Sequence, residues 1–560
     1  MSARLAAALL AALSMAQSPA VPDIVVYNGR IVTVDQAFSI AEAAAILNGR
    51  FTAVGRSEAV KRLATRSTRL IDLGGRTVIP GLIDNHLHSA GGGSGVDLSR
   101  ARSIDDVLRA VFARIEQTPA GGIVISNSDW HEAQLNEHRL PLRDDLDQIS
   151  PSHPVVLVRG GHEYVLNSAA LARWKIDEKT AAPAGGRISR YPDGRLNGEL
   201  VDTAKRLVDL PAGAQRTMGQ RIGDRLADYQ KLHAAGLTTV RHPGISIDEY
   251  RVLQEIKRRG VLTMRINVLL RPSGDASAVL KLLDDSAIRP DEGDEWLRVG
   301  GIKLGVDGGF EGGLMRETYA TPYDENGAFK GLQTVERAGF EKLVRTLNSR
   351  GWRLATHAVG DAAIDLVLDV YEAANKERSI VGRRFSIEHA FIGRSDQLVR
   401  LKRLDVAISA QNHLYLAGPS LLKYWGDERA AITTPIRMYL DAGLLVSSGT
   451  DSPVVPYPPL WTIYHFVTRD TMTGGVMGSD QRITRQEALR LATINNARLM
   501  FEESIKGSIE VGKVADLVVL SDDILASPES RIRDAEVLMT MVGGQIVHTH
   551  KDMATGMVGR

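Results

Sequence analysis

The sequence predicts an α/β protein: a TIM-type (β/α)8 barrel with a small β-sandwich domain built from both chain ends and a long insertion after barrel strand 1. Three observations carry this prediction. Short apolar runs alternate with helical stretches through the middle of the chain, both ends are rich in strand-forming residues, and one connection is far longer than the others. Alternating strands and helices are typical of a parallel sheet covered by helices.

Eight apolar runs are the candidate barrel strands, and eight is the number of strands that closes such a barrel. They are Thr77–His88, Leu237–His242, Leu262–Leu270, Val299–Asp307, Arg353–Ala358, Phe385–His389, Val406–Gln411 and Leu444–Thr450. Between and after them the sequence predicts helices at Gln220–Ala235, Val335–Ser349, Ala362–Asn375 and Arg485–Phe501. Because active sites of these barrels lie at the carboxyl ends of the strands, functional residues are expected there.

The two ends of the chain are expected to form one small β domain from residues 21–80 and 505–560. Strand-forming runs surround the turns Asn28-Gly29 and Asn48-Gly49, and further runs start at Ala515 and Val537. Asn-Gly between such runs is typical of a tight turn between strands. The barrel then occupies residues 81–504.

Roughly 150 residues separate the first candidate strand from the second, whereas ordinary βα connections have only a few residues. Residues 95–210 of this connection carry strand signals of their own at 122–126 and 155–158. The insertion follows directly after two histidines of the first strand. We therefore expect it to form a lid or a wall of a substrate cavity.

Length and charge limit the classes of function. A chain of 560 residues is too long for one ordinary core. Its 68 Lys and Arg nearly balance 67 Asp and Glu, giving a net charge of +1. Nothing in this balance favours a nucleic acid or an acidic membrane as partner. The composition is typical of a soluble enzyme for a small molecule, and a homodimer is the default expectation if the chain associates.

Residues 1–20 are expected to be a signal peptide. Arg4 precedes the apolar run Leu5–Ala16, which is too short for a membrane span but suits a signal-peptide core, and small residues follow. The alternative is a short N-terminal helix. The chain has no cysteine, which excludes disulfides and a lipid-anchored lipoprotein. We expect an exported protein, periplasmic or secreted, with no membrane span once the signal is removed.

His86 and His88 stand two residues apart on the first candidate strand, so both side chains are expected on the same face. At the carboxyl end of a barrel strand, that face looks into the barrel mouth. Two imidazoles there can share one borderline cation. Such a pair also occurs by chance, so His86 and His88 alone do not establish a metal site.

Other strand ends carry the same kind of residue: Lys303, His357, His389 and Asp451. Each follows mostly apolar residues at the point where its strand is expected to meet solvent. A single histidine in such a place is commonly a hydrogen-bonded core residue. Four histidines, a lysine and an aspartate at five strand ends are instead typical of a metal site at the mouth of the barrel.

With these residues in these motifs, the sequence resembles the amidohydrolase superfamily, specifically its YtcJ-like (amidohydrolase 3) branch. The matching motifs are Pro80–His88, Gly301–Lys303, Thr356–Asp361, Ser386–Ala390 and Gly449–Pro453, with Gly161–Ser168 in the insertion and Lys506–Leu520 near the end. The resemblance runs from about Asp23 to the C-terminus. These ordered motifs are specific for the superfamily and much less so for a substrate.

The resemblance implies a site for one or two divalent ions. The first ion would be held by His86, His88, Lys303 and Asp451, and the second by Lys303, His357 and His389. Lys303 would carry CO2 as a carbamate, because a charged ammonium would be repelled by two dications whereas a neutral amine can become an anionic ligand. Zinc is the first choice, with iron and manganese left open. The alternative is a single ion, with Lys303 paired to Asp307 or Asp451.

The resemblance further implies hydrolysis of a carbon–nitrogen bond other than a peptide bond, in an amide, formamide or cyclic amide, by a metal-activated water. Asp451 would accept the proton of the water and pass it to the leaving amine. Two alternatives stay open: a metal-dependent isomerase or lyase on the same barrel, and a binding protein without catalysis, which the complete ligand set disfavours.

Five further residues are weaker candidates for contact with the substrate: Trp130, His162, His242, Gln411 and His413. His162 either touches the substrate or caps a loop, and Trp130 lines either the cavity or the core. Arg241, beside His242, binds a substrate carboxylate or pairs with a neighbouring acid. Asn412 stands where many relatives have proline, which leaves the role of His413 open.

Overall fold

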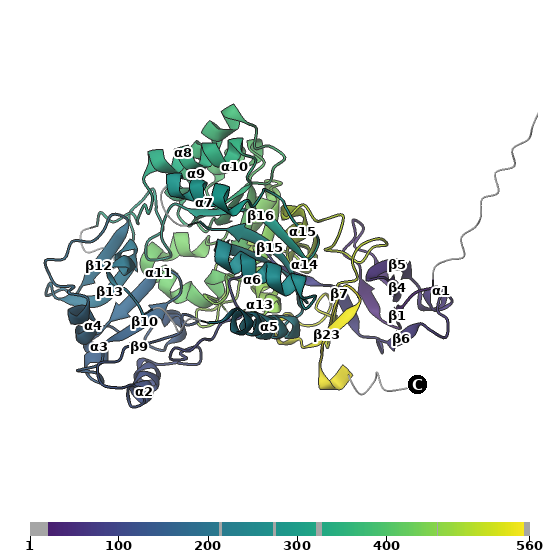
Figure 1. The fold of residues 1–560 in the computed structure, drawn as a ribbon, viewed down its shortest axis with the longest axis horizontal. Helices are drawn as coiled ribbons and strands as arrows, with labels where there is room; N and C mark the ends of the chain where they lie inside the picture. Colours follow the sequence, from purple (N-terminus) through teal and green to yellow (C-terminus); the bar gives the residue numbers. More distant parts are fainter. Residues whose placement is uncertain (1–20, 212–215, 273–275, 321–326, 456, 554–560) are drawn as a thin grey trace, which may run out of the picture.

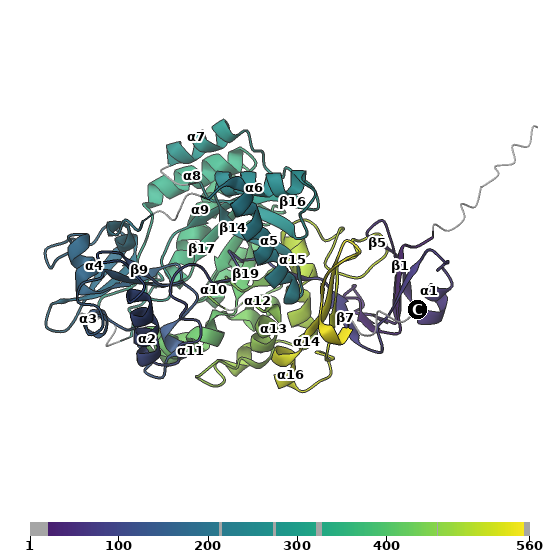
Figure 2. The same cartoon turned by 60° about the horizontal axis from the view of Figure 1, so that its bottom comes forward.

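The computed structural model describes residues 21–211, 216–272, 276–320, 327–455 and 457–553. A barrel occupies the middle of the molecule, the insertion lies on one side of it and the small β domain on the other (Figures 1 and 2). The expected signal peptide, residues 1–20, lies outside the described residues. Within these ranges no helix combines the length and apolar character that a membrane span requires.

Eight parallel strands form the barrel, as predicted, and each pairs with its neighbour in chain order. They are β8 (Leu82–Asp84), β14 (Leu237–Ile245), β15 (Arg265–Leu270), β16 (Leu297–Gly305), β17 (Leu354–Ala358), β18 (Ser386–His389), β19 (Ala407–Gln411) and β20 (Val446–Gly449). Beyond β8 and β20, the Asn85 N–H donates to the carbonyl of Ser448 (3.2 Å) and the Asp451 N–H to that of His86 (2.6 Å). The sheet therefore curls nearly into a closed barrel.

Helices pack around the strands (Figures 1 and 2). They include α5 (Met218–Ala234), α6 (Ile247–Arg258), α7 (Ala276–Ser286), α8 (Arg337–Ser349), α9 (Asp361–Glu377), α10 (Ser395–Arg403), α11 (His413–Ala431), α12 (Ile436–Asp441) and α13 (Pro459–Thr468). Thr217 and Ser246 begin α5 and α6 with capping boxes, which satisfy backbone N–H groups of the first turn. These caps explain where two of the barrel helices start.

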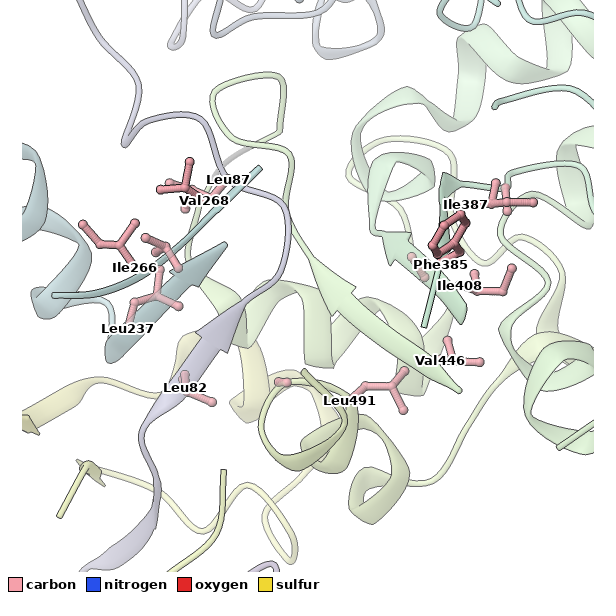
Figure 3. Close-up of a cluster of buried hydrophobic side chains, with 14 of the residues drawn as sticks. Leu82, Leu87, Leu237, Ile266, Val268, Phe385, Ile387, Ile408, Val446 and Leu491 are labelled. Atoms are coloured by element: carbon pink, nitrogen blue, oxygen red, sulfur yellow. The ribbon is translucent and has the colours of Figure 1, made fainter. Parts of the chain in front are cut away.

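Apolar side chains of the strands form the core between barrel and helices (Figure 3). Leu82, Leu237, Ile266, Ile387 and Val446 come from five different strands and are at most 2% exposed. Each such side chain contributes roughly 1.5–3 kcal/mol by its burial. This core fixes the strand ends, and with them the side chains at the barrel mouth.

The predicted helix Arg485–Phe501 is two helices, α14 (Arg485–Leu491) and α15 (Ile494–Leu499). The break falls at Thr493, whose φ of −137° and ψ of −95° are not helical. It turns α15 so that the Asn496 amide donates to the carbonyls of Ile83 (2.5 Å) and Ser448 (2.9 Å). The second helix therefore ties the first barrel strand to the last.

The predicted strand Thr77–His88 is also divided. Residues Thr77–Pro80 form β7 of the small domain, and β8 begins after Gly81. A Cβ at Gly81 would lie 2.3 Å from Oγ1 of Thr238, so the close approach of β14 requires glycine there. His86 and His88 follow the strand instead of lying on it, and their positions are set by the turn.

Two sheets form the small domain, with a shared apolar core between them. The first contains β1 (Ile24–Tyr27), β4 (Ala43–Leu47), β5 (Arg50–Gly55) and β6 (Arg69–Asp72), with helix α1 (Ser57–Lys61) beside it. The second contains β2 (Arg30–Val32), β3 (Ile40–Ala41), β7, β21 (Leu517–Leu520), β22 (Val537–Val542) and β23 (Gln545–Thr549), and α16 (Glu529–Asp534) lies between β21 and β22 in the chain. Both chain ends thus enter one sheet, where β7 pairs with β21.

The two Asn-Gly turns of the small domain differ. Asn48 and Gly49 have φ values of 50° and 74° and join the antiparallel strands β4 and β5, as expected for a hairpin. Around Asn28-Gly29 the chain also turns between two strands, as predicted, but β1 and β2 belong to different sheets and do not pair. This second turn carries the chain from one layer of the sandwich to the other.

The insertion contains a five-stranded sheet in the order β12-β13-β11-β10-β9. Its elements are α2 (Ile104–Ile115), β9 (Val124–Ile125), α3 (Arg143–Asp147), β10 (Val155–Arg159), β11 (Glu163–Leu166), α4 (Ser168–Arg173), β12 (Gly186–Arg190), β13 (Leu196–Asp202) and the 3-10 helix η2 (Thr203–Leu207). The strand signals at 122–126 and 155–158 correspond to β9 and β10. The turn between β10 and β11 and the start of η2 face the barrel mouth, where they line a cavity.

Candidate metal centre

A cavity of about 640 Å³ lies where the barrel mouth meets the insertion, within the size range of small-molecule sites. The barrel contributes its strand ends, and the insertion contributes residues between β10 and β11 and from η2. Every metal-ligand candidate of the sequence analysis lines this cavity: His86, His88, Lys303, His357, His389 and Asp451. Strand ends far apart in the sequence thus meet around one space.

Three donor groups stand close enough to share one ion. Ligand atoms of His86, His389 and Asp451 lie within 4.8 Å of one another, and all three residues are buried. They come from the ends of the first, sixth and eighth barrel strands. His88 lies farther out, with 43% of its side chain exposed.

The ring of His86 is held by a buried carboxylate. Its Nδ1 lies 2.6 Å from Oε2 of Glu388, and Glu388 is in turn bound by the Arg241 guanidinium (3.0 Å) and the Ser386 hydroxyl (2.6 Å). Arg241 therefore pairs with a neighbouring acid, which was one of its two predicted roles. A carboxylate on one nitrogen of a histidine fixes the ring and leaves the other nitrogen for a metal.

Asp451 is surrounded by imidazoles. Its carboxylate oxygens lie 3.1 Å from Nε2 of His88, 3.2 Å from that of His413 and 3.4 Å from that of His86. Burial alone would raise the pKa of Asp451, but His86, His413 and His88 hold it well below its usual range. The carboxylate therefore stays ionised and can act as a ligand and as a base.

His389 and Asp451 both adopt the left-handed backbone region, with φ values of 75° and 60°. Such conformations cost roughly 1–3 kcal/mol for residues other than glycine and persist where the surroundings enforce them. Here the Asp451 N–H donates to the His86 carbonyl, and the Ala390 N–H to that of Ala358 (3.0 Å). The strain turns both side chains into the cavity.

The buried imidazoles of His86, His357 and His389 are uncharged. Burial, with smaller contributions from neighbouring cations, lowers the pKa of His86 to about 4 and holds that of His357 and His389 well below the usual value. His389 Nδ1 is buried without a hydrogen-bond partner among the described residues. His357 packs edge-on against His389, with ring centroids 4.5 Å apart. Neutral imidazoles with an unused lone pair suit a divalent cation, so the residues fit a metal.

Lys303 lies at the centre of this group, 5% exposed, with Nζ 3.3 Å from Nε2 of His86. Burial lowers the pKa of Lys303 to about 8. Within the described ranges Lys303 forms no ion pair with Asp307 or Asp451. Asp307 instead accepts hydrogen bonds from backbone N–H groups of residues 314, 359 and 360.

The insertion adds a histidine–aspartate pair to the cavity. His162 Nδ1 lies 2.6 Å from Oδ1 of Asp202, and the His162 ring stacks on that of His357 at 5.3 Å. Burial would lower the pKa of His162, but Asp202 raises it overall. A glycine loop after β16 makes room for the pair: a Cβ at Gly308 would lie 1.9 Å from Oδ2 of Asp202, and one at Gly309 3.0 Å from the His162 ring.

Of the five candidate substrate residues, His162 and His413 line the cavity. The interpretation of the other three needs correction. Trp130 donates to the Val158 carbonyl (2.8 Å) in the core of the insertion, and Gln411 donates to the Ser409 hydroxyl (2.9 Å) inside the barrel. Neither lines the cavity.

His242 is the third, and its strand explains the error. Side chains alternate along β14, and Arg241 takes the interior position. His242 therefore faces outward, where its Nδ1 binds the Leu87 carbonyl (2.7 Å) and its ring lies 6.5 Å from that of Tyr229 on α5.

Three carboxylates that organise the site had no role predicted from the sequence: Asp84, Asp202 and Glu388. Asp84 accepts from the His86 N–H (2.9 Å) and from the Thr450 hydroxyl (2.7 Å), which fixes the first and last strand ends together. Burial raises the pKa of Asp84 to about 7. For Asp84 and Glu388 a signal existed, since an acid inside an apolar strand must find a buried partner. Asp202 gave no comparable signal.

Known proteins share both the motifs and the architecture. The sequence pattern of the Amidohydrolase family matches residues 69–548. An N-substituted formamide deformylase of Arthrobacter pascens is 30% identical, with 93% of this chain and 97% of the relative covered. The putative amidohydrolase YtcJ of Bacillus subtilis is 26% identical, over 93% and 98% of the two chains.

Among solved structures, an uncharacterized metal-dependent hydrolase of Pyrococcus horikoshii superposes with a TM-score of 0.67 at 24% identity, covering 90% of this chain and 99% of the other. This likeness supports the barrel fold. The family pattern covers most of the sequence, and the polar residues of the matching motifs converge on a cavity whose donors fit a divalent metal. The chain therefore belongs to the amidohydrolase family, and it is a metal-dependent hydrolase of carbon–nitrogen bonds other than peptide bonds.

Proposed function

We propose that this enzyme hydrolyses an amide-type bond of a small molecule: a carboxamide, a formamide or a cyclic amide. The observation that carries the proposal is the convergence of ligand atoms of His86, His389 and Asp451 within 4.8 Å at the wall of the cavity. A carboxylate and neutral imidazoles are the ligands expected around a hydrolytic metal. The deformylase relative makes N-substituted formamides the first substrates to test.

When bound, a divalent metal would supply acidity to a water molecule and polarise the scissile carbonyl. The side chains would transfer the protons and position the reacting groups. Asp451, ionised among three imidazoles, accepts the proton of the water and delivers it to the nitrogen of the leaving amine. Glu388 keeps the His86 ring in place during this transfer. His162, held by Asp202, offers its other nitrogen to the substrate from the insertion side.

We further propose that the metal is zinc and that Lys303, modified to a carbamate, would be one of the residues that hold it. Zinc suits a set of imidazoles and carboxylates. A lysine whose pKa is about 8 has an appreciable neutral fraction near neutral pH. Its amine nitrogen can then bond to CO2 with loss of one proton, which gives an anionic oxygen ligand beside His86. His357 and His389 are the histidines available to a second ion.

Replacing Lys303 with alanine tests the carbamate. The Lys303→Ala variant should bind less zinc than the wild type. Short carboxylates such as propionate should restore part of the lost zinc binding. Lys376→Ala, on the exposed side of α9, is the control. ¹³C NMR after incubation with ¹³C-labelled CO2 should show a carbamate carbon in the wild type that the variant lacks. A zinc-loaded wild type without that signal would contradict the carbamate.

Isotope labelling separates hydrolysis from isomerisation or elimination on the same barrel. Turnover of an N-substituted formamide in oxygen-18 water should place one labelled oxygen in the formate released. The amine product should carry no label. Turnover of a substrate without incorporation of solvent oxygen would reject hydrolysis.

A further inference from the structure

The acids that line the cavity already have partners. Asp202 is bound to His162, Asp307 to backbone N–H groups, and Asp451 to three imidazoles. Glu311 lies 3.1 Å from the Arg159 guanidinium, which also contacts Glu132 and Glu163 at 2.9 Å each. The charge of the Arg159 guanidinium is therefore balanced by carboxylates of the protein.

Besides Arg159 and Lys303, three basic residues line the same cavity: Lys205, Arg206 and Arg271. The Lys205 ammonium donates to the carbonyl of Gly161 and lies 4.8 Å from the ring centroid of Tyr164. Arg206 and Arg271 are exposed. In the part of the chain that the structure describes, neither guanidinium has a hydrogen bond or an ion pair. The cavity thus holds two arginines that pair with no carboxylate of the described residues.

The two arginines reach the cavity from different parts of the molecule. Arg206 lies on η2, four residues after Asp202. Arg271 directly follows β15, the strand next to Lys303 on β16, and its N–H is fixed by the Ile245 carbonyl (2.9 Å). Partial loss of hydration and the nearby Arg206 lower the pKa of Arg271. The fold therefore holds two like charges near each other at the edge of the metal centre, an arrangement that an anion would stabilise.

We propose that Arg206 and Arg271 bind a carboxylate on the part of the substrate that does not react, so that the preferred substrates are anionic amides. The inference rests on the proposed hydrolysis of amides, whose substrate class it narrows. Guanidinium groups bind carboxylates through paired, charge-assisted hydrogen bonds. Lys205 adds positive charge on the same wall. The carboxylate then holds the substrate by its far end while the amide carbonyl lies at the metal centre.

Non-hydrolysable ligands test this inference without turnover. N-methylsulfonyl-phenylalanine and N-methylsulfonyl-phenethylamine differ only in the carboxylate, and the leucine and alanine derivatives give further matched pairs with the corresponding amines. Their binding to the zinc-loaded full chain is measured by calorimetry at low and high salt. The proteins compared are the wild type, Arg206→Gln, Arg271→Gln and a control, Arg251→Gln, an exposed arginine of α6 outside the cavity.

We expect the wild type to bind the carboxylates at least about tenfold more tightly than their neutral partners, with a preference that weakens as salt rises. Arg206→Gln and Arg271→Gln should each reduce that preference about tenfold, whereas Arg251→Gln should retain it. Equal binding within the pairs, no binding of any carboxylate, or an undiminished preference in both cavity variants would overturn the inference. If the protein prefers carboxylates but cleaves no amide, the proposed function is wrong, whereas the inferred anion site is still supported.

Discussion

Single residues around the metal centre work through partners that lie one contact farther away. His86 would bind the ion, but Glu388 decides which nitrogen faces it, and Arg241 balances the charge of Glu388. Asp84 fixes the backbone N–H of His86 in the same way. A metal site therefore depends on more residues than its ligands. The buried carboxylates that hold the ligands in place matter as much as the ligands themselves.

Replacing Glu388 with glutamine should weaken metal binding. The neutral amide no longer balances Arg241 and holds the His86 ring less firmly, so we expect the dissociation constant for zinc to rise about 10–100-fold. Calorimetric titration of chelator-treated protein measures it. Glu178→Gln, an exposed glutamate of the insertion, is the matched control. Unchanged zinc affinity in a folded Glu388→Gln protein would show that the carboxylate does not orient His86.

His465, on α13 outside the cavity, predicts how stability depends on pH. It is fully buried, and burial lowers its pKa to about 3, whereas an unfolded histidine titrates near 6.5. Between these values the unfolded chain binds a proton that the folded chain does not. Stability contributed by neutral His465 is therefore present above about pH 6.5 and is lost as the pH falls, by up to about 1.4 kcal/mol per pH unit.

Denaturant titrations of wild type and His465→Gln at pH 5 and pH 7 measure this effect. The wild type should lose more of its free energy of unfolding between pH 7 and pH 5 than the variant does. His138→Gln, at an exposed histidine, should follow the wild type. Parallel curves for wild type and His465→Gln would mean that the folded protein takes up the proton after all.

Among the elements, the contact between the insertion and the loop after β16 is the one that completes the cavity. Gly308 and Gly312 pack directly against the Asp202 carboxylate, and a Cβ at either would lie within 2.3 Å of its Oδ2. Asp202 in turn holds His162 over His357. The glycines therefore let an element of the insertion approach the barrel closely enough to contribute to the site.

Gly308→Ala should lower activity more than stability. The added methyl group must displace Asp202, and with it His162, so we expect kcat/KM to fall by about tenfold or more. Gly223→Ala, in helix α5, places a methyl group in open space and should leave kcat/KM unchanged while slightly favouring the helix. Steady-state kinetics and thermal unfolding of both variants are compared. Full activity of Gly308→Ala would remove the insertion from the catalytic arrangement.

Two elements have boundaries that the sequence pattern did not predict. Periodicity predicted one strand over Thr77–His88 and one helix over Arg485–Phe501, yet each is divided. The causes are tertiary: Thr238 approaches Gly81, and Asn496 must reach Ile83 and Ser448. An apolar pattern reports burial and period, and it carries no signal for a neighbour far away in the chain.

For the whole molecule, the order of strands and helices was enough to predict the barrel, because parallel strands in chain order leave few other arrangements. The convergence of six candidate ligands followed from that topology alone, since carboxyl ends of barrel strands meet at one mouth. The wall opposite the strand ends could not be predicted in this way. Asp202 and Arg206 reach the cavity through the packing of the insertion, which no repeat or period encodes.

A zinc titration of chelator-treated protein tests whether the converging ligands hold a metal that hydrolysis requires. Bound metal and turnover of an N-substituted formamide are recorded together. We expect turnover to rise in proportion to the zinc bound, and we expect that His389→Ala, which lacks one of the three converging ligands, neither binds zinc tightly nor regains activity. Turnover by the metal-free wild type, or wild-type zinc affinity in His389→Ala, would contradict these expectations.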